Sequence, residues 1–128
     1  MKNTLGIKHI ALKVKNFDEC LLFYTKIVGM EVDWQPDGSN AYLSNGKDNL
    51  ALHKDSNITL ESSDNRLDHF GIMLTDKIHV DEWFDYLKSK NIEIYKNPQD
   101  HRDGSRSFYC YDPDKNILQF LWHPKMNK

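Results

Sequence analysis

The sequence has little that would cross-link the chain or anchor it to a membrane. Its 128 residues contain two cysteines, Cys20 and Cys110, which is too few for the disulfide framework of a small secreted domain. The first residues lack the positive segment and apolar core of a secretory signal, so we expect a cytoplasmic protein. No apolar run approaches the roughly 20 residues needed to cross a bilayer. We therefore expect no membrane partner.

Charge of either sign is also not concentrated. Seventeen basic and nineteen acidic residues give a net charge of −2, without a basic cluster or stripe. A phosphate backbone attracts proteins mainly through such clusters, so we expect no nucleic-acid partner. The hydrophobic content of 39% is enough for one well-buried core, and a chain of this length favours a single domain over residues 1–128.

A repeated pattern around two histidines is the most informative feature that is present. His9 lies in the stretch 7–12 and His69 in the stretch 67–72, each at the same point of a strand-like pattern. Two copies of one small unit place equivalent positions together when they pack around a pseudo-twofold axis. The repeat therefore predicts that the two imidazoles share one site, and two imidazoles in one cavity suggest a metal.

The hydrophobic periodicity predicts the same order of elements in a first module, about 5–55, and a second, about 67–124. A polar stretch from Asp55 to Arg66 is the predicted linker. In the first module we expect a helix from Asn16 or Asp18 to Val28, stopped by Gly29, and strands at 7–14, 30–34, 41–44 and 49–54. Pro36-Asp37-Gly38 and Asn45-Gly46 are the predicted turns between its strands.

In the second module the pattern predicts a helix over about 79–90, capped by Asp76 or a nearby Asp, and strands at 68–74, 92–95, 106–111 and 117–122. Each module then has the order βαβββ. The predicted fold class is α+β, with two βαβββ modules whose curved sheets form a cavity.

The chain resembles the vicinal oxygen chelate superfamily of glyoxalases, fosfomycin-resistance enzymes, bleomycin-resistance proteins and type I extradiol dioxygenases. The resemblance rests on the two histidines, on Phe23-Tyr24 and Val28-Gly29-Met30, and on the loop 112–116 before Ile117-Leu118-Gln119. It implies a cavity that holds one divalent metal, either Fe(II), Mn(II), Zn(II) or Ni(II), and a small substrate with vicinal oxygens.

The ligands that the resemblance implies are His9, His69 and Gln119. Metal-binding relatives generally have Glu at the third position, and Gln keeps the oxygen donor while removing the charge. Glyoxalase I enzymes use a further carboxylate on the fourth strand, where this chain has Ala51; His53, two residues later on the same face, is the alternative ligand there. The ligand set of glyoxalase I is thus incomplete, which argues against that activity.

A narrower likeness, to the end of the extradiol dioxygenase catalytic domain, covers Asp100 to Asp103, Ser107 to Tyr109 and Gln119 to Trp122. It implies that His101 acts as acid or base and that Tyr109 donates a hydrogen bond to the substrate. Arg102 and Arg106 would hold a substrate carboxylate or phosphate.

Two functions remain open from the sequence. One is a metal-dependent enzyme, either dioxygenase-like or lyase- or transferase-like. The other is a metal-free module of the bleomycin-resistance type that binds a small molecule, since Gln119 can satisfy both histidines by hydrogen bonds. Tyr109 fits strand packing as well as catalysis, and His101 fits a solvated loop. We expect a homodimer, because twofold symmetry is the commonest assembly of soluble proteins.

Overall fold

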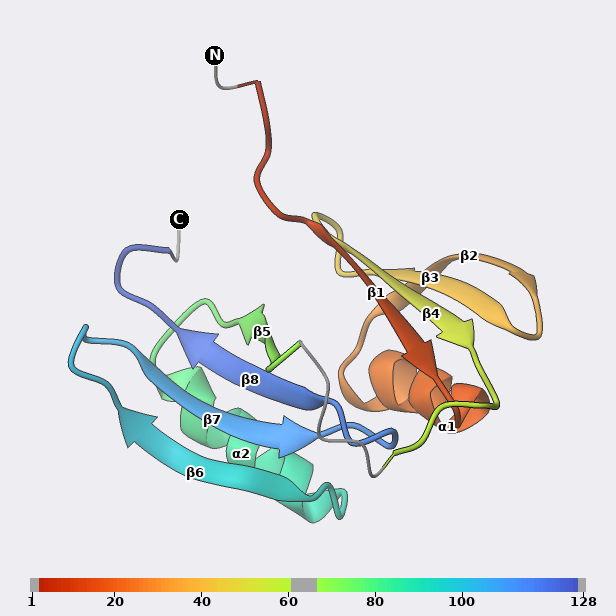
Figure 1. Cartoon of the computed structure of the whole chain (residues 1–128). Helices are drawn as coiled ribbons and strands as arrows, with labels where there is room; N and C mark the ends of the chain where they lie inside the picture. The colour runs from red at the N-terminus through yellow and green to blue at the C-terminus, as the bar shows by residue number, and fades with distance from the viewer. Residues whose placement is uncertain (1–2, 61–66, 127–128) are drawn as a thin grey trace. The chain divides into compact units, whose positions relative to one another are not determined.

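The computed structural model describes residues 3–60 and 67–126. The chain divides between Leu60 and Glu61 into two compact units, and each is described by itself. The elements, in chain order, are β1 (His9–Val14), α1 (Phe17–Leu22), a π-helical turn η1 (Phe23–Ile27), β2 (Glu31–Asp37), β3 (Asn40–Ser44), β4 (Asn49–Lys54), β5 (Phe70–Met73), α2 (Ile78–Ser89), β6 (Ile94–Asp100), β7 (Arg106–Tyr111) and β8 (Ile117–Trp122). This confirms the predicted α+β class with two βαβββ modules (Figure 1).

The two sheets have the same topology. The described strands of the first unit follow the order β1-β4-β3-β2, and those of the second follow β5-β8-β7-β6. In each sheet the first and last strands of the module pair in parallel, and the other neighbours are antiparallel. The repeat seen around the two histidines is therefore a repeat of structure.

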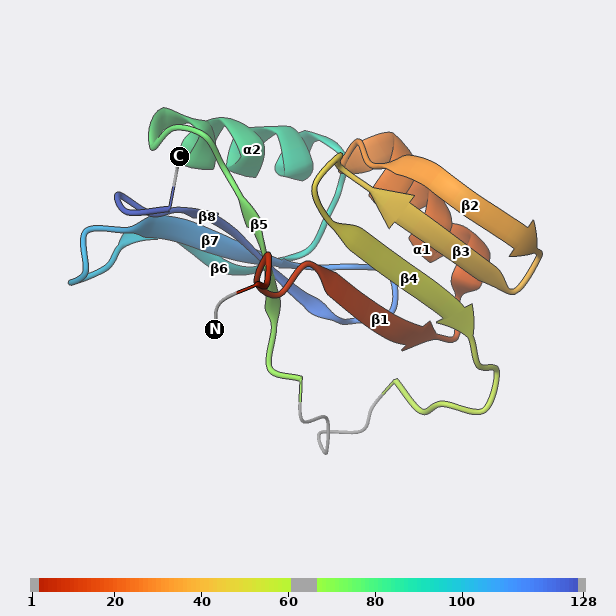
Figure 2. The ribbon, with the colours of Figure 1, turned by 90° about the horizontal axis from the view of Figure 1, so that it is seen from above.

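Each sheet packs one face on its own helix, as Figure 2 shows for α1 and α2. In the first unit Leu12, Val14, Leu43 and Leu52 are at most 5% exposed, while His9 on β1 and the alternate residues of that strand point the other way. In the second unit Phe120 stacks on Trp83 of α2. Successive strand residues point to opposite faces, so each sheet is left with one face free of its helix.

Two strands are longer than predicted, and both contain a proline. The predicted strand 30–34 extends to Asp37, and the strand predicted at 92–95 runs from Ile94 to Asp100. Pro36 and Pro98 lie where the register of these strands shifts. Both strands are at sheet edges, where a residue without an N–H costs no ladder hydrogen bond. The turn expected at Pro36-Asp37-Gly38 is therefore confined to Gly38 and Ser39.

Smaller differences concern the ends of elements. β5 begins at Phe70, so His69 immediately precedes the strand instead of lying inside it. The second helix is preceded by Lys77 as its N-cap residue, and Asp76 contributes a backbone carbonyl to His79 instead of a side-chain cap. The predicted stop at Gly29 is confirmed, since this residue has φ +93°, a conformation that favours glycine.

Other sequence expectations concern the linker, the cysteines and membrane segments. Of the predicted linker, residues 61–66 lie outside the described residues. Cys20 and Cys110 are buried free thiols, and burial raises the pKa of Cys110 to about 12. No helix in the described ranges is both long and apolar enough to span a bilayer.

The aromatic packing of α2 predicts a large loss of stability when Phe120 is truncated. Phe120 is 0% exposed and stacks on both Trp83 and Phe108. Phe120→Ala should lower the free energy of unfolding by about 3–5 kcal/mol, because it leaves a cavity between helix and sheet. Ile78→Ala, at a position on α2 that is 62% exposed, should change it by less than about 0.5 kcal/mol. Urea denaturation measures both, and equal effects would contradict this packing.

Candidate functional site

The helix-free face of the second sheet carries two of the residues predicted for the site, Tyr109 and Gln119. In the register of the sheet Gln119 of β8 pairs with Tyr109 of β7 on one side and with Gly71 of β5 on the other. Paired residues point to the same face. A Cβ at Gly71 would lie 4.0 Å from Oε1 of Gln119, so the missing side chain leaves this oxygen uncovered on the β5 side.

A pocket of about 450 Å³ opens in this unit beside Gln119. Its walls come from the turn after β6, from β7, and from β8 with the residue that follows it. The lining residues are His101, Arg102, Asp103, Ser105, Tyr109, Gln119, Leu121 and His123. Four of the predicted site residues, His101, Arg102, Tyr109 and Gln119, thus line one pocket.

Ser107 links two of them. Its hydroxyl oxygen accepts a hydrogen bond of 3.0 Å from Nε2 of Gln119, and Nε2 of His101 lies 2.7 Å from the same oxygen. Ser107 is only 1% exposed, so water does not compete with these contacts. The amide of Gln119 is held with its nitrogen toward Ser107 and its carbonyl oxygen, Oε1, directed elsewhere.

His69 lies against Tyr109. The two rings meet edge to face, with centroids 5.2 Å apart. Nδ1 of His69 is 2.7 Å from a carboxylate oxygen of Asp68, an acceptor that favours the neutral tautomer with its proton on Nδ1. Nε2 then carries the lone pair, and within the described residues it makes no hydrogen bond.

The first unit repeats this arrangement around His9. Nδ1 of His9 is 2.8 Å from Oδ1 of Asn49, its partner on β4. An amide oxygen is also an acceptor, so the proton is again placed on Nδ1 and the lone pair on Nε2. His53 on the same strand as Asn49 is held in a similar way by Asn40, at 2.7 Å. Ala51 between them is fully buried and offers no donor atom.

Arg106 has a different environment from that expected of a substrate-binding residue. Nε and Nη2 each donate to one carboxylate oxygen of Asp81 on α2, both at 2.9 Å, and Nη1 donates to Asp100 at 3.1 Å. These bonds raise the pKa of Arg106 and lower the pKa of Asp81 below its usual range. Arg106 is not among the residues that line the pocket.

The turn after β6 is braced by its own hydrogen bonds. Asp103 accepts from the hydroxyl and backbone N–H of Ser105 at 2.6 and 2.9 Å, and these bonds are the main cause of its lowered pKa. His123 lies 3.5 Å from the same carboxylate. The backbone N–H of His101 donates to the carbonyl of Ser105. Two side chains for which the sequence predicted no role in the site therefore belong to it: Ser107, and His123, which was expected at the surface.

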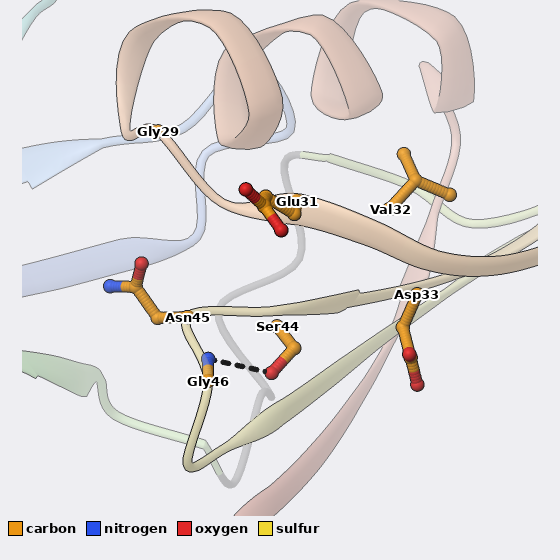
Figure 3. A pocket seen from close by; sticks show the side chains of 7 residues that line it. All are labelled: Gly29, Glu31, Val32, Asp33, Ser44, Asn45 and Gly46. Atoms are coloured by element: carbon orange, nitrogen blue, oxygen red, sulfur yellow. Dashed lines mark hydrogen bonds between the residues drawn. The ribbon is translucent and has the colours of Figure 1, made fainter.

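A second pocket of about 410 Å³ lies in the first unit, between the start of β2 and the end of β3 (Figure 3). Glu31 and Asp33 supply its charge, and the backbone N–H of Gly46 donates to Ser44. It contains none of the predicted site residues. Among the residues that the structure describes, no group of three or more His, Cys, Asp or Glu side chains is arranged to hold a metal.

The sequence profile of the Glyoxalase/Bleomycin resistance protein/Dioxygenase superfamily matches residues 6–120. The chain belongs to this superfamily. The chain is 29% identical to metallothiol transferase FosB from Staphylococcus haemolyticus over 115 residues. The match covers 89% of this chain and 81% of that protein. FosB from Staphylococcus epidermidis matches at the same identity and coverage.

Solved structures agree on the fold. A glyoxalase/bleomycin resistance protein/dioxygenase from Alicyclobacillus acidocaldarius has a TM-score of 0.74 and 26% identity, covering 98% of this chain and 96% of that one. Lactoylglutathione lyase from Agrobacterium tumefaciens has a TM-score of 0.77 at 22% identity, with coverage of 94% and 96%. At that identity the likeness shows the fold alone.

The contacts of Arg106 predict a structural effect for its substitution. Arg106→Lys should lower stability by about 1 kcal/mol, since lysine cannot make the two parallel bonds to Asp81. The loss should be much smaller in an Asp81→Asn background, because the partner charge is already gone. Chemical denaturation of the four proteins measures this coupling, and equal losses in both backgrounds would contradict it.

The same pair predicts a dependence on pH. Because the pKa of Asp81 is lower in the folded protein than its ordinary value, the stabilisation is complete at neutral pH and is lost as the pH falls through the folded pKa. The difference in free energy of unfolding between the native protein and Arg106→Lys should be constant near neutral pH and should decrease toward zero below about pH 4. A difference that grows on acidification would contradict the assignment.

Proposed function

We propose that this protein is a metal-dependent enzyme that acts on a small substrate with vicinal oxygens. The observation that carries the proposal is the state of the two histidines. Each is held at Nδ1 by an oxygen acceptor, Asp68 for His69 and Asn49 for His9. Metal-binding histidines commonly have such a partner, because it fixes the tautomer and leaves Nε2 available to the metal.

The proposed ligands within the second unit are Nε2 of His69 and Oε1 of Gln119, and His9 as a third ligand stays a prediction from the sequence. Imidazole nitrogen and amide oxygen suit first-row divalent ions such as Zn(II), Fe(II), Ni(II) or Mn(II). The set carries no negative charge, so we expect modest affinity. A bound metal would supply Lewis acidity, which polarises oxygen atoms of the substrate.

The remaining residues of the pocket suit an anionic, oxygen-rich substrate. Arg102 is exposed at the pocket wall, and its guanidinium can hold a carboxylate or phosphate with two parallel hydrogen bonds. Tyr109 brings a hydroxyl that can donate to a substrate oxygen. His101 is half-buried in the same pocket and is the proposed group for proton transfer.

The relatives favour transfer of a thiol as the reaction. The FosB proteins, which match this chain over most of its length, are metallothiol transferases. The likeness of the last third to extradiol dioxygenases remains a prediction. Two assays on protein loaded with each metal distinguish the reactions. Consumption of a thiol in the presence of small oxygen-bearing electrophiles indicates thiol transfer, and oxygen uptake with catechols indicates a dioxygenase.

Metal titration tests the ligand set. His69→Ala should weaken binding of Zn(II) or Mn(II) at least about tenfold, and Gln119→Glu should strengthen it by about tenfold or more, because a carboxylate attracts the dication. His79→Ala is the matched control, since Nδ1 of His79 is also held by a carboxylate, that of Glu82, but lies on α2. Isothermal titration calorimetry measures all four proteins. No binding to the native protein, or equal effects of His69→Ala and His79→Ala, would refute the proposal.

A metal-free binding module is the second candidate. It is favoured by the hydrogen bonds to Ser107, which hold Nε2 of Gln119 and Nε2 of His101 in place without an ion. In that case a ligand of the native protein would bind equally well with and without a chelator. Under the metal-dependent proposal the chelator would abolish binding, and Gln119→Glu would leave the dependence in place.

A further inference from the structure

We propose that Ser107 is a positioning residue that sets which nitrogen of His101 carries its proton, according to whether residue 119 donates or accepts a hydrogen bond. We call the hydrogen-bonded series Gln119, Ser107 and His101 the relay. Its role in catalysis rests on the proposed function, but its hydrogen bonds require no metal. It runs from β8 through β7 to the turn after β6, within the second unit.

The first step is the proton count at Ser107. A serine hydroxyl has one proton to donate and two lone pairs. In the described part of the chain its oxygen has two hydrogen-bond contacts, with Nε2 of Gln119 and Nε2 of His101. The amide nitrogen of Gln119 is a donor and uses a lone pair of the hydroxyl. The serine proton is therefore left for His101.

The second step follows from burial. Ser107 is 1% exposed, and a buried hydroxyl proton without an acceptor costs about 1–3 kcal/mol. Within the described residues the acceptor available to this proton is Nε2 of His101, at 2.7 Å. Nε2 must then be unprotonated, so neutral His101 carries its proton on Nδ1. In the resulting relay Gln119 donates to Ser107, and Ser107 donates to His101.

The third step connects the relay to the pocket. The same amide orientation directs Oε1 of Gln119 away from Ser107, toward the side left open by Gly71. Nδ1 of His101 makes no hydrogen bond to the described residues, and His101 lines the pocket. When Gln119 presents Oε1 as a ligand, His101 therefore presents Nδ1–H as a donor to the substrate. In this state His101 can act as the acid in proton transfer.

Replacing residue 119 should reverse the relay. The side chain introduced by Gln119→Glu would be an ionised carboxylate, which accepts hydrogen bonds and donates none. The hydroxyl of Ser107 would then donate to that carboxylate, and Nε2–H of His101 would donate to Ser107. The proton on His101 would appear at Nε2, although His101 itself does not touch residue 119.

Long-range proton–nitrogen NMR spectra of the ¹⁵N-labelled full chain measure this directly, at about pH 8, above the ordinary imidazole pKa, and with chelator present. A His101→Gln spectrum assigns the His101 signals. We expect Nε2 to be unprotonated in the native protein and protonated in Gln119→Glu. Ser107→Ala and the double variant Ser107→Ala/Gln119→Glu should show the same protonation of Nε2 of His101, because the hydroxyl that links residue 119 to His101 is absent from both.

Ser105→Ala is the matched control. Ser105 is also buried, at 3% exposure, and lies in the same pocket, but its hydroxyl donates to Asp103. This variant should keep the native state of His101. A proton on Nε2 in the native protein, no change in Gln119→Glu, or a change that persists without Ser107 would each overturn the relay. Because chelator is present throughout, these outcomes are independent of whether the protein binds a metal.

Discussion

Burial of one face of each sheet against its own helix is the constraint on which the site depends. In the second unit Trp83 and Phe84 of α2 pack on Phe120 and Phe108. Because strand residues alternate between faces, this packing directs Ser107, Tyr109 and Gln119 to the opposite face. The polar residues of the pocket are thus oriented by apolar contacts that they do not make themselves.

The same constraint explains how much could be predicted from the sequence. The sequence pattern along 106–111 and 117–122 predicted both strands with the bounds that the structure gives them. Edge strands were predicted too short, because a proline normally ends a strand and the sequence does not reveal which strands lie at an edge. The order of strands in each sheet depends on pairing between distant segments, which local patterns do not reveal.

The site was predicted less completely than the fold, for physical reasons. A serine next to an aromatic residue in a strand resembles any small strand residue in sequence, so no role was predicted for the Ser107 hydroxyl until its oxygen was seen between His101 and Gln119. Arg106 gave the opposite result. Its charge suggested a substrate contact, but its guanidinium is engaged by Asp81 and Asp100. Asp81 lies on α2, 25 residues away in sequence, and could not be paired with Arg106 by spacing.

Whether a metal binds at the proposed ligands is the central question, and anomalous diffraction from crystals soaked with Zn(II) tests it most directly. We predict a peak at the zinc edge about 2.0–2.2 Å from Nε2 of His69 and from Oε1 of Gln119. A peak at another histidine such as His79, with density for His69 and Gln119 that contains no ion, would contradict the proposed ligand set.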